Sequence, residues 1–277
     1  TYPVRQVLDC VVDAERLLDG LRARAQAAGA TLLDHHALAG YRVGKGGVAV
    51  TLAPARTLSG RVLVDGMGAS SPHAAFDLVC PTVGGVLGGL DVGDDAGAVD
   101  PRVGEILVTT EGIEDERQHL WEGFPGPVGR FTPYLFSYTE PAHLPAQPLR
   151  ALYERFFATR PRYKRGDATL IKPTYGFIPA YSRLRPMPVA RDRVLLVGDA
   201  AGRHSPLTFC GFGSMIRSFL PVADALRARL AQRDGRLDAR ALASLWREPP
   251  GLAVMGGLTL MMVPGRRPTT DPHGVNR

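Results

Sequence analysis

The residues best suited to chemistry lie in one glycine-rich stretch that runs from 192 to 213. An apolar strand, 193–197, ends there at Gly198 and Asp199. Ligands of open α/β sheets gather beyond the carboxyl ends of strands, so Asp199 is placed to accept a hydrogen bond from a ligand hydroxyl. A turn or helix-capping aspartate is the alternative interpretation.

Two further glycines, Gly211 and Gly213, come directly before a helix that the pattern predicts over 213–230. Glycine leaves the backbone bare, and the exposed N–H groups of a helix N-terminus stabilise negative charge. Negative charge develops on the ring of a reduced flavin, so this arrangement has a chemical use. Plain turn glycines are the alternative.

This stretch carries a resemblance to a known family. Val197-Gly-Asp-Ala-Ala201, with Pro206 and Gly211-x-Gly213, resembles the second flavin-contact motif of FAD proteins related to aromatic hydroxylases, geranylgeranyl reductases and lycopene cyclases. The resemblance implies that the cofactor is FAD, with NAD(P)H as the candidate reductant. It implies cofactor contacts at Gly198, Asp199, Ala200, Pro206, Gly211, Phe212 and Gly213.

Two other segments resemble the same family and occur in its order. The segment 11–32 resembles its strand–helix–strand unit, and 61–71 resembles the strand and glycine turn that return the chain to the FAD domain. Within the family, 198–213 is most similar to the lycopene cyclase-related branch. Gly202 stands where a typical hydroxylase of this family has histidine.

The chain also departs from the family. Such proteins open with a strand, Gly-x-Gly-x-x-Gly and a helix, which together bind the pyrophosphate, and nothing here fits that pattern. The run 84–89 is glycine-rich, but no helix follows it. Because the chain starts at Thr1, we expect an N-terminally incomplete sequence; a protein that dispenses with this unit, or obtains it from a second chain, is the alternative. Without the central strands, apolar sheet edges would be exposed, so we expect low stability.

Glu140 is the candidate for acid catalysis. It ends the aromatic strand 134–140, where lycopene cyclases carry an acidic motif. Cyclisation of a polyene requires a proton for an unreactive double bond, and a carboxylic acid whose pKa is raised by desolvation can supply it. A surface carboxylate at a strand end is the alternative. Glu111 and Glu122 are lesser candidates.

The elements that position these residues follow from periodicity and turn signals. The expected fold class is α/β: a glutathione-reductase-type FAD-binding domain, incomplete at its N-terminus, interleaved with an antiparallel β-sheet substrate domain. We predict helices at 14–28, 148–157, 238–246 and 252–263, and strands at 4–12, 31–33, 41–43, 47–52, 60–64, 84–90, 105–110, 118–124, 131–138 and 193–197. The predicted boundaries are 1–75 and 186–264 for the FAD-binding domain, 76–185 for the substrate sheet and helix, and 265–277 for a flexible tail.

Composition limits the partners. The net charge of +6 comes mainly from scattered arginines, which does not indicate a nucleic-acid-binding surface. Three widely spaced cysteines predict neither disulfides nor a metal site, so we expect a reducing, cytoplasmic location. The aromatic sheet could line a pocket for a lipophilic small molecule, although core packing is the favoured interpretation for any single aromatic residue. For the apolar helix 252–263, core packing and peripheral membrane contact both remain open.

The function that the resemblance implies is that of an FAD-dependent enzyme acting on an isoprenoid or carotenoid, similar to lycopene cyclases. One alternative is an NAD(P)H-dependent monooxygenase, halogenase or prenyl reductase on the same scaffold. Another is a non-catalytic or truncated flavoprotein that binds no flavin.

Overall fold

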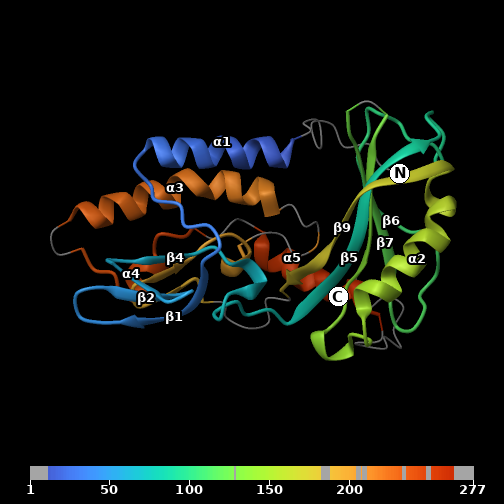
Figure 1. Ribbon diagram of the computed structural model, residues 1–277. Helices are drawn as coiled ribbons and strands as arrows, with labels where there is room; N and C mark the ends of the chain where they lie inside the picture. The colour runs from blue at the N-terminus through green and yellow to red at the C-terminus, as the bar shows by residue number, and fades with distance from the viewer. Residues whose placement is uncertain are drawn as a thin grey trace.

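The computed structural model describes residues 12–127, 129–181, 188–203, 207, 211–232, 235–247 and 251–264. It has two lobes, and the long strands β5 (Leu78–Leu90) and β9 (Gly166–Ala180) run from one towards the other (Figure 1). One lobe is built on an antiparallel sheet, and the other contains two smaller sheets and most of the helices.

The antiparallel sheet has five strands in the order β6-β7-β8-β5-β9. The remaining strands are β6 (Glu105–Val108), β7 (His119–Pro125) and β8 (Phe131–Ser137). These elements confirm the strands predicted within 84–138, although β6 ends two residues before the prediction. The 15-residue β9 was not predicted as one strand, because prolines at 173 and 179 interrupt its apolar pattern.

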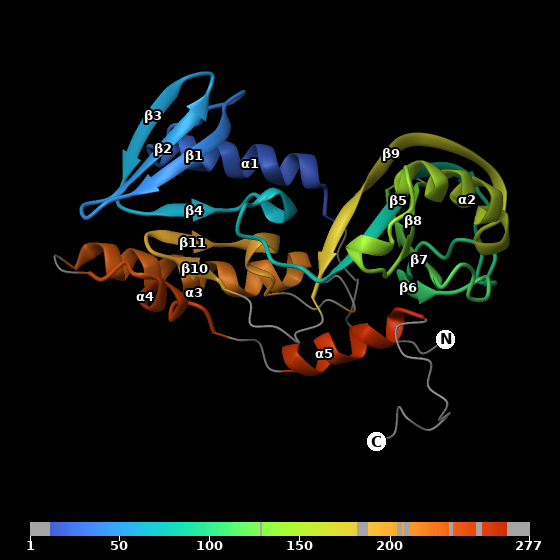
Figure 2. The same cartoon turned by 90° about the horizontal axis from the view of Figure 1, so that it is seen from below.

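Helix α2 (Pro148–Tyr163) covers one face of this sheet (Figure 2). Its buried residues include Leu152, Phe156 and Tyr163, whose helical spacing places them on one stripe. They pack with Trp121 of β7 in one core cluster. Side chains alternate across a strand, so Glu122 lies on the opposite face of the sheet.

That opposite face turns towards the second lobe (Figure 1). Leu120 and Phe136 pack there against Val263, at the end of helix α5 (Leu252–Thr259) and the short 3-10 helix η4 (Leu260–Met262). Val254 and Met261 on the same segment stay exposed. The predicted helix 252–263 therefore packs on the core along one side only.

The second lobe contains helix α1 (Ala14–Ala27), which confirms the first predicted helix. A three-stranded antiparallel sheet follows, with a turn at Gly44–Gly47 as predicted. Its strands are β1 (Ala37–Val43), β2 (Val48–Ala53) and β3 (Arg56–Gly60).

A second small sheet holds the glycine-rich stretch. Strand β11 (Val194–Leu196) pairs in parallel with β4 (Leu63–Asp65) and antiparallel with β10 (Ala190–Arg191). Helix α3 (Gly211–Ala231) follows, and α4 (Ala239–Ala243) is capped by Asp238, whose side chain accepts a hydrogen bond from Ala241 N.

Some predicted elements differ from the structure. Residues 31–33 do not form a strand, because no described strand lies beside them to complete a hydrogen-bonded ladder. The predicted strand 60–64 is divided between β3 and β4. Helix α3 begins two residues earlier than predicted, and the helix predicted at 238–246 ends at Ala243. Of the predicted strand 4–12, only residue 12 lies within the described residues.

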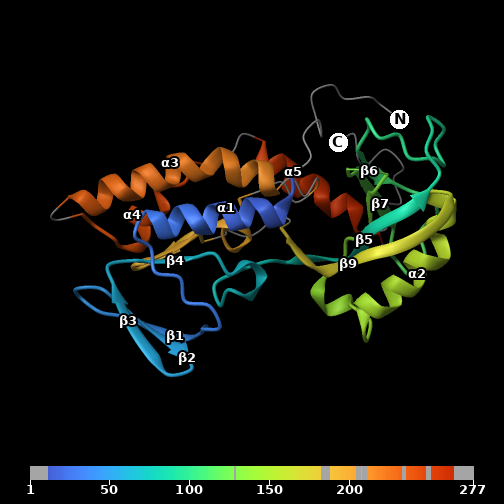
Figure 3. The same cartoon turned by 45° about the horizontal axis from the view of Figure 1, so that its top comes forward.

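Two helices present unpaired apolar faces. Leu18 of α1 and Ile216, Phe219 and Leu220 of α3 are each at least 60% exposed. Both helices run on the same side of the β4–β11 pair (Figure 3). Within the part of the chain that the structure describes, no helix is long and apolar enough to cross a membrane.

Candidate functional site

The glycine-rich stretch and the earlier turn at 66–71 meet at the carboxyl ends of β11 and β4. Val197 N donates a hydrogen bond to Asp65 O at 2.8 Å, which continues the parallel ladder. Two short 3-10 helices, η1 (Gly68–Ser70) and η3 (Gly198–Ala201), then pack against each other. This is the end of a parallel pair at which ligands are expected.

The backbone conformation at this junction favours glycine. Gly198 and Gly68 have φ values of 60° and 61°, a region in which side chains with a Cβ are strained. A Cβ on Gly68 would lie 3.8 Å from the Cβ of Asp199, and one on Gly198 would lie 3.4 Å from Met215 Sδ. The two turns and the start of α3 therefore form one compact unit.

Asp65 holds the β4 turn in place. Its side chain is buried and accepts hydrogen bonds from Met67 N at 2.9 Å and Ser71 Oγ at 2.5 Å. Sequence reasoning did not single out this residue. The sequence pattern that could have identified Asp65 is the one that identified Asp199: an acidic residue directly after an apolar strand.

The turn at Asp199 is fixed by contacts to both lobes. Tyr181, directly after β9, donates a hydrogen bond from its hydroxyl to Asp199 O at 2.6 Å. The side chain of Ala200 is buried in a core cluster with Val194 and Leu196, so only its backbone remains for a cofactor contact. Trp246 Nε1 donates to Leu196 O at 3.1 Å and anchors the end of β11.

The start of α3 leaves space beside the turn. Gly211 is buried, whereas Phe212 is 46% exposed. A Cβ on Gly213 would meet no atom within 4 Å. Gly213, in the first turn of α3, therefore has open space at its Cβ position. Pro206, the other predicted contact, lies outside the described residues.

The antiparallel sheet reaches the same region. Tyr138, directly after β8, donates a hydrogen bond from its hydroxyl to Leu207 O at 2.6 Å, within the glycine-rich stretch. Glu140 follows two residues later and is half-buried. Its neighbour Thr139 forms a β-bridge with Val79 of β5. At the same place β5 also pairs with the end of β9. Glu140 thus lies at the sheet end nearest the Asp199 turn.

Known structures share this architecture. No protein-family model and no curated protein sequence matches the chain. A geranylgeranyl bacteriochlorophyll reductase-like protein from Thermoplasma acidophilum is similar over 85% of this chain, with a TM-score of 0.62 and 17% identity. Halogenase PltM, solved in complex with phloroglucinol and FAD, is similar over 82%, with a TM-score of 0.56 and 16% identity. The peptidyl tryptophan dihydroxylase QhpG is similar over 92%, with a TM-score of 0.51 and 19% identity.

The fold is similar to that of FAD-dependent oxidoreductases. The chain spans only part of these proteins, 58% of the reductase-like protein and 49% of the halogenase. At these identities the likeness extends to the fold and not to the substrate.

The two lesser acidic candidates have different surroundings. Glu111 accepts hydrogen bonds from Arg155 Nη2 at 2.6 Å and Arg162 Nη1 at 2.9 Å, so its carboxylate is engaged by two cations on α2. Glu122 is only 8% exposed, and its Oε1 has no hydrogen-bond partner among the described residues. Burial raises the pKa of Glu122 from 4.5 to about 7.

The raised pKa of Glu122 predicts how stability depends on pH. Between pH 4.5 and 7 the native state keeps a proton that the unfolded state releases, so stability falls as pH rises. We expect wild type to lose roughly 2–3 kcal/mol relative to Glu122→Gln between pH 5 and pH 8. Urea unfolding of both proteins at pH 5 and pH 8 measures this difference. An equal change in the free energy of unfolding of wild type and Glu122→Gln between the two pH values would contradict the prediction.

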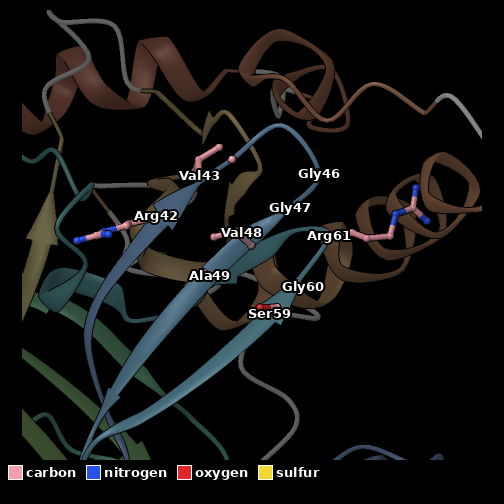
Figure 4. A pocket seen from close by; sticks show the side chains of 10 residues that line it. Arg42, Val43, Gly46, Gly47, Val48, Ala49, Ser59, Gly60 and Arg61 are labelled. Atoms are coloured by element: carbon pink, nitrogen blue, oxygen red, sulfur yellow. The ribbon is translucent and has the colours of Figure 1, made fainter.

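The structure also has a cavity that lies away from the Asp199 turn and from the acidic candidates. It has a volume of about 550 Å³ and is lined by the β1–β2 turn and by Gly60 and Arg61 (Figure 4). Arg61 precedes β4, so the cavity lies at the opposite end of the parallel pair from Asp65. Among the described residues, no group of three or more His, Cys, Asp or Glu side chains could hold a metal ion.

Proposed function

We propose that this chain provides the flavin-ring side and the substrate sheet of an FAD-dependent oxidoreductase that acts on an apolar, isoprenoid-like molecule. The observation that carries the proposal is the junction at Asp199. There the carboxyl ends of two parallel strands, the open start of α3 and the α2-free face of an antiparallel sheet come together.

The residues present fit one half of FAD. The open space beside Gly213 leaves room for a flat ring against the N-terminus of α3, and Gly198 keeps the adjoining turn compact. FAD, when bound, would supply two-electron redox chemistry. In this chain Asp199 would accept a hydrogen bond from a ribityl hydroxyl, and the first N–H groups of α3 would stabilise negative charge on the ring.

The residues do not fit the other half of the cofactor. A pyrophosphate requires a glycine-rich loop that leads into a helix, and the run 84–89 lies inside β5 instead. We therefore assign only ribityl and ring contacts to this chain.

Riboflavin tests this assignment, because it consists of the ring and the ribityl chain alone. We expect Gly213→Leu to weaken riboflavin binding at least tenfold, because the leucine side chain would enter the space beside α3, where a Cβ meets no atom within 4 Å. Gly257→Leu on α5 is the matched control, since a Cβ there also meets nothing within 4 Å. Fluorescence quenching of riboflavin measures both affinities. Equal affinities in the two variants would overturn the assignment, and a tenfold loss in Asp199→Ala would support it.

Redox chemistry is the first choice of reaction, because the similar structures include a reductase-like protein and a dihydroxylase. Flavin-dependent oxidation of NAD(P)H that is accelerated by an isoprenoid supports a reductase or monooxygenase. A specific observation keeps lycopene cyclase-like, non-redox cyclisation as a second candidate: Glu140 lies at the sheet end nearest the Asp199 turn. Conversion of a polyene without net NAD(P)H oxidation, abolished in Glu140→Gln, would favour that candidate.

The α5 segment could help the protein to collect a lipophilic substrate. Its exposed side chains, Val254 at 66% and Met261 at 53%, could contact a membrane surface from which such a substrate is collected. We propose this contact as peripheral only.

A further inference from the structure

Glu122 is a buried acid that forms no ion pair with the described residues. It lies on β7, on the face of the sheet that α2 does not cover, and it is directly opposite Tyr134 of β8. The Tyr134 ring packs edge-to-face on Phe124, with centroids 6.1 Å apart, so the surroundings are aromatic. None of the described salt bridges involves Glu122.

The titratable groups that face Glu122 do not supply a positive charge. They are Cys80 on β5 and Tyr134 and Tyr138 on β8, and burial raises the pKa of each, so all three stay neutral. On β7 itself, burial lowers the pKa of His119 to about 4, so this imidazole is also neutral above that pH. On the α2 side, burial likewise keeps the Tyr163 hydroxyl protonated.

A neutral carboxylic acid is a hydrogen-bond donor, and this one has no acceptor at Oε1 within the described residues. A buried polar group without a partner is costly, and native proteins leave few of them. An acceptor oxygen on a bound molecule would satisfy it. A carboxylate ligand would bring a second negative charge to the same site, and an ammonium ligand would require Glu122 to ionise.

Glu122 lies further along the sheet than the contact with the glycine-rich stretch. From Tyr134, opposite Glu122, the strand β8 leads in four residues to Tyr138, whose hydroxyl binds Leu207 O. Four residues of strand span about 13 Å. Leu120 and Phe136 lie between these two points and pack against Val263, so a ligand of Glu122 would lie beyond that contact, beside Tyr134 and Phe124.

We propose that Glu122, as a neutral donor, binds the acceptor oxygen of an apolar ligand, such as a ketone, aldehyde or ester. The identification of this ligand with the substrate rests on the proposed function. The donor role of Glu122 itself rests on the geometry of the sheet.

The test uses geranylacetone, a neutral isoprenoid ketone, and follows its binding by tryptophan emission, to which Trp121 on the same strand contributes. We expect constant affinity below pH 6 and an approximately tenfold weaker affinity at pH 8, because only the protonated acid donates. Glu122→Gln keeps a donor but does not titrate, so its affinity should not depend on pH. Glu122→Leu should bind about 5- to 30-fold more weakly than wild type at pH 6.

A hydrocarbon with the same carbon skeleton is the matched probe, and its affinity should be the same for wild type and Glu122→Leu. The proposal is overturned if wild type does not bind the ketone, if its affinity is independent of pH or rises with pH, or if Glu122→Leu binds the ketone as tightly as wild type. If Glu122→Leu does not fold, the pH dependence of ketone affinity in wild type and Glu122→Gln still tests the proposal. Loss of riboflavin binding with an intact ketone titration would contradict the proposed function alone.

Discussion

Replacing Phe156 by alanine is expected to lower the free energy of unfolding by about 4 kcal/mol. The Phe156 side chain is fully buried between α2 and the sheet, where its ring lies 5.3 Å from Trp121 and 6.1 Å from Tyr153, measured between centroids. Alanine would remove this apolar contact area and leave a cavity that the surrounding rings cannot fill without leaving their rotamers.

The adjacent residue provides the control. Phe157 is 53% exposed, so Phe157→Ala removes a ring of the same size that is mostly in water. We expect a change of about 0.5 kcal/mol or less. Guanidinium unfolding followed by tryptophan fluorescence compares the two variants. A similar loss in both would mean that α2 does not pack on the sheet through the face described.

The second large effect is expected at a buried lysine. Lys164 is 1% exposed, and its Nζ donates hydrogen bonds to Ala96 O, Ala98 O and Glu105 Oε1, the last at 2.6 Å. Tyr163 donates a hydrogen bond to the other oxygen of Glu105 at 2.6 Å. Glu105→Gln keeps the size of the side chain but leaves the ammonium group buried without a counter-charge. We expect a loss of about 3 kcal/mol, because removing one member of a buried ion pair leaves an uncompensated charge.

An exposed pair provides the comparison. Glu15 of α1 forms an ion pair with Lys172 of β9, and both side chains are largely exposed. Water and salt screen this pair, so Glu15→Gln should not change stability measurably. Thermal unfolding of the two variants at low and high salt tests the difference. Equal stability of Glu105→Gln and wild type would show that Lys164 finds its compensation elsewhere.

The sequence by itself determined much of the local structure. Short β-rich runs between Gly, Pro and Asp breaks predicted the strands within 84–138, because these residue types end strands. Asp238 predicted the start of α4, because an N-cap side chain binds an N–H group within the same turn. The glycine-rich stretch predicted a helix start at 213, and α3 begins two residues earlier, at Gly211.

Only the tertiary structure decided which residues meet. Asp65 and Asp199 are far apart in the chain, and the pairing of β4 with β11 brings their turns together. The contrast between Glu111 and Glu122 depends on neighbours from other elements, because two arginines of α2 reach only one of them. Local patterns carry no information about such long-range contacts. The burial that raises the pKa of Glu122 to about 7 therefore became visible only after the sheet was assembled.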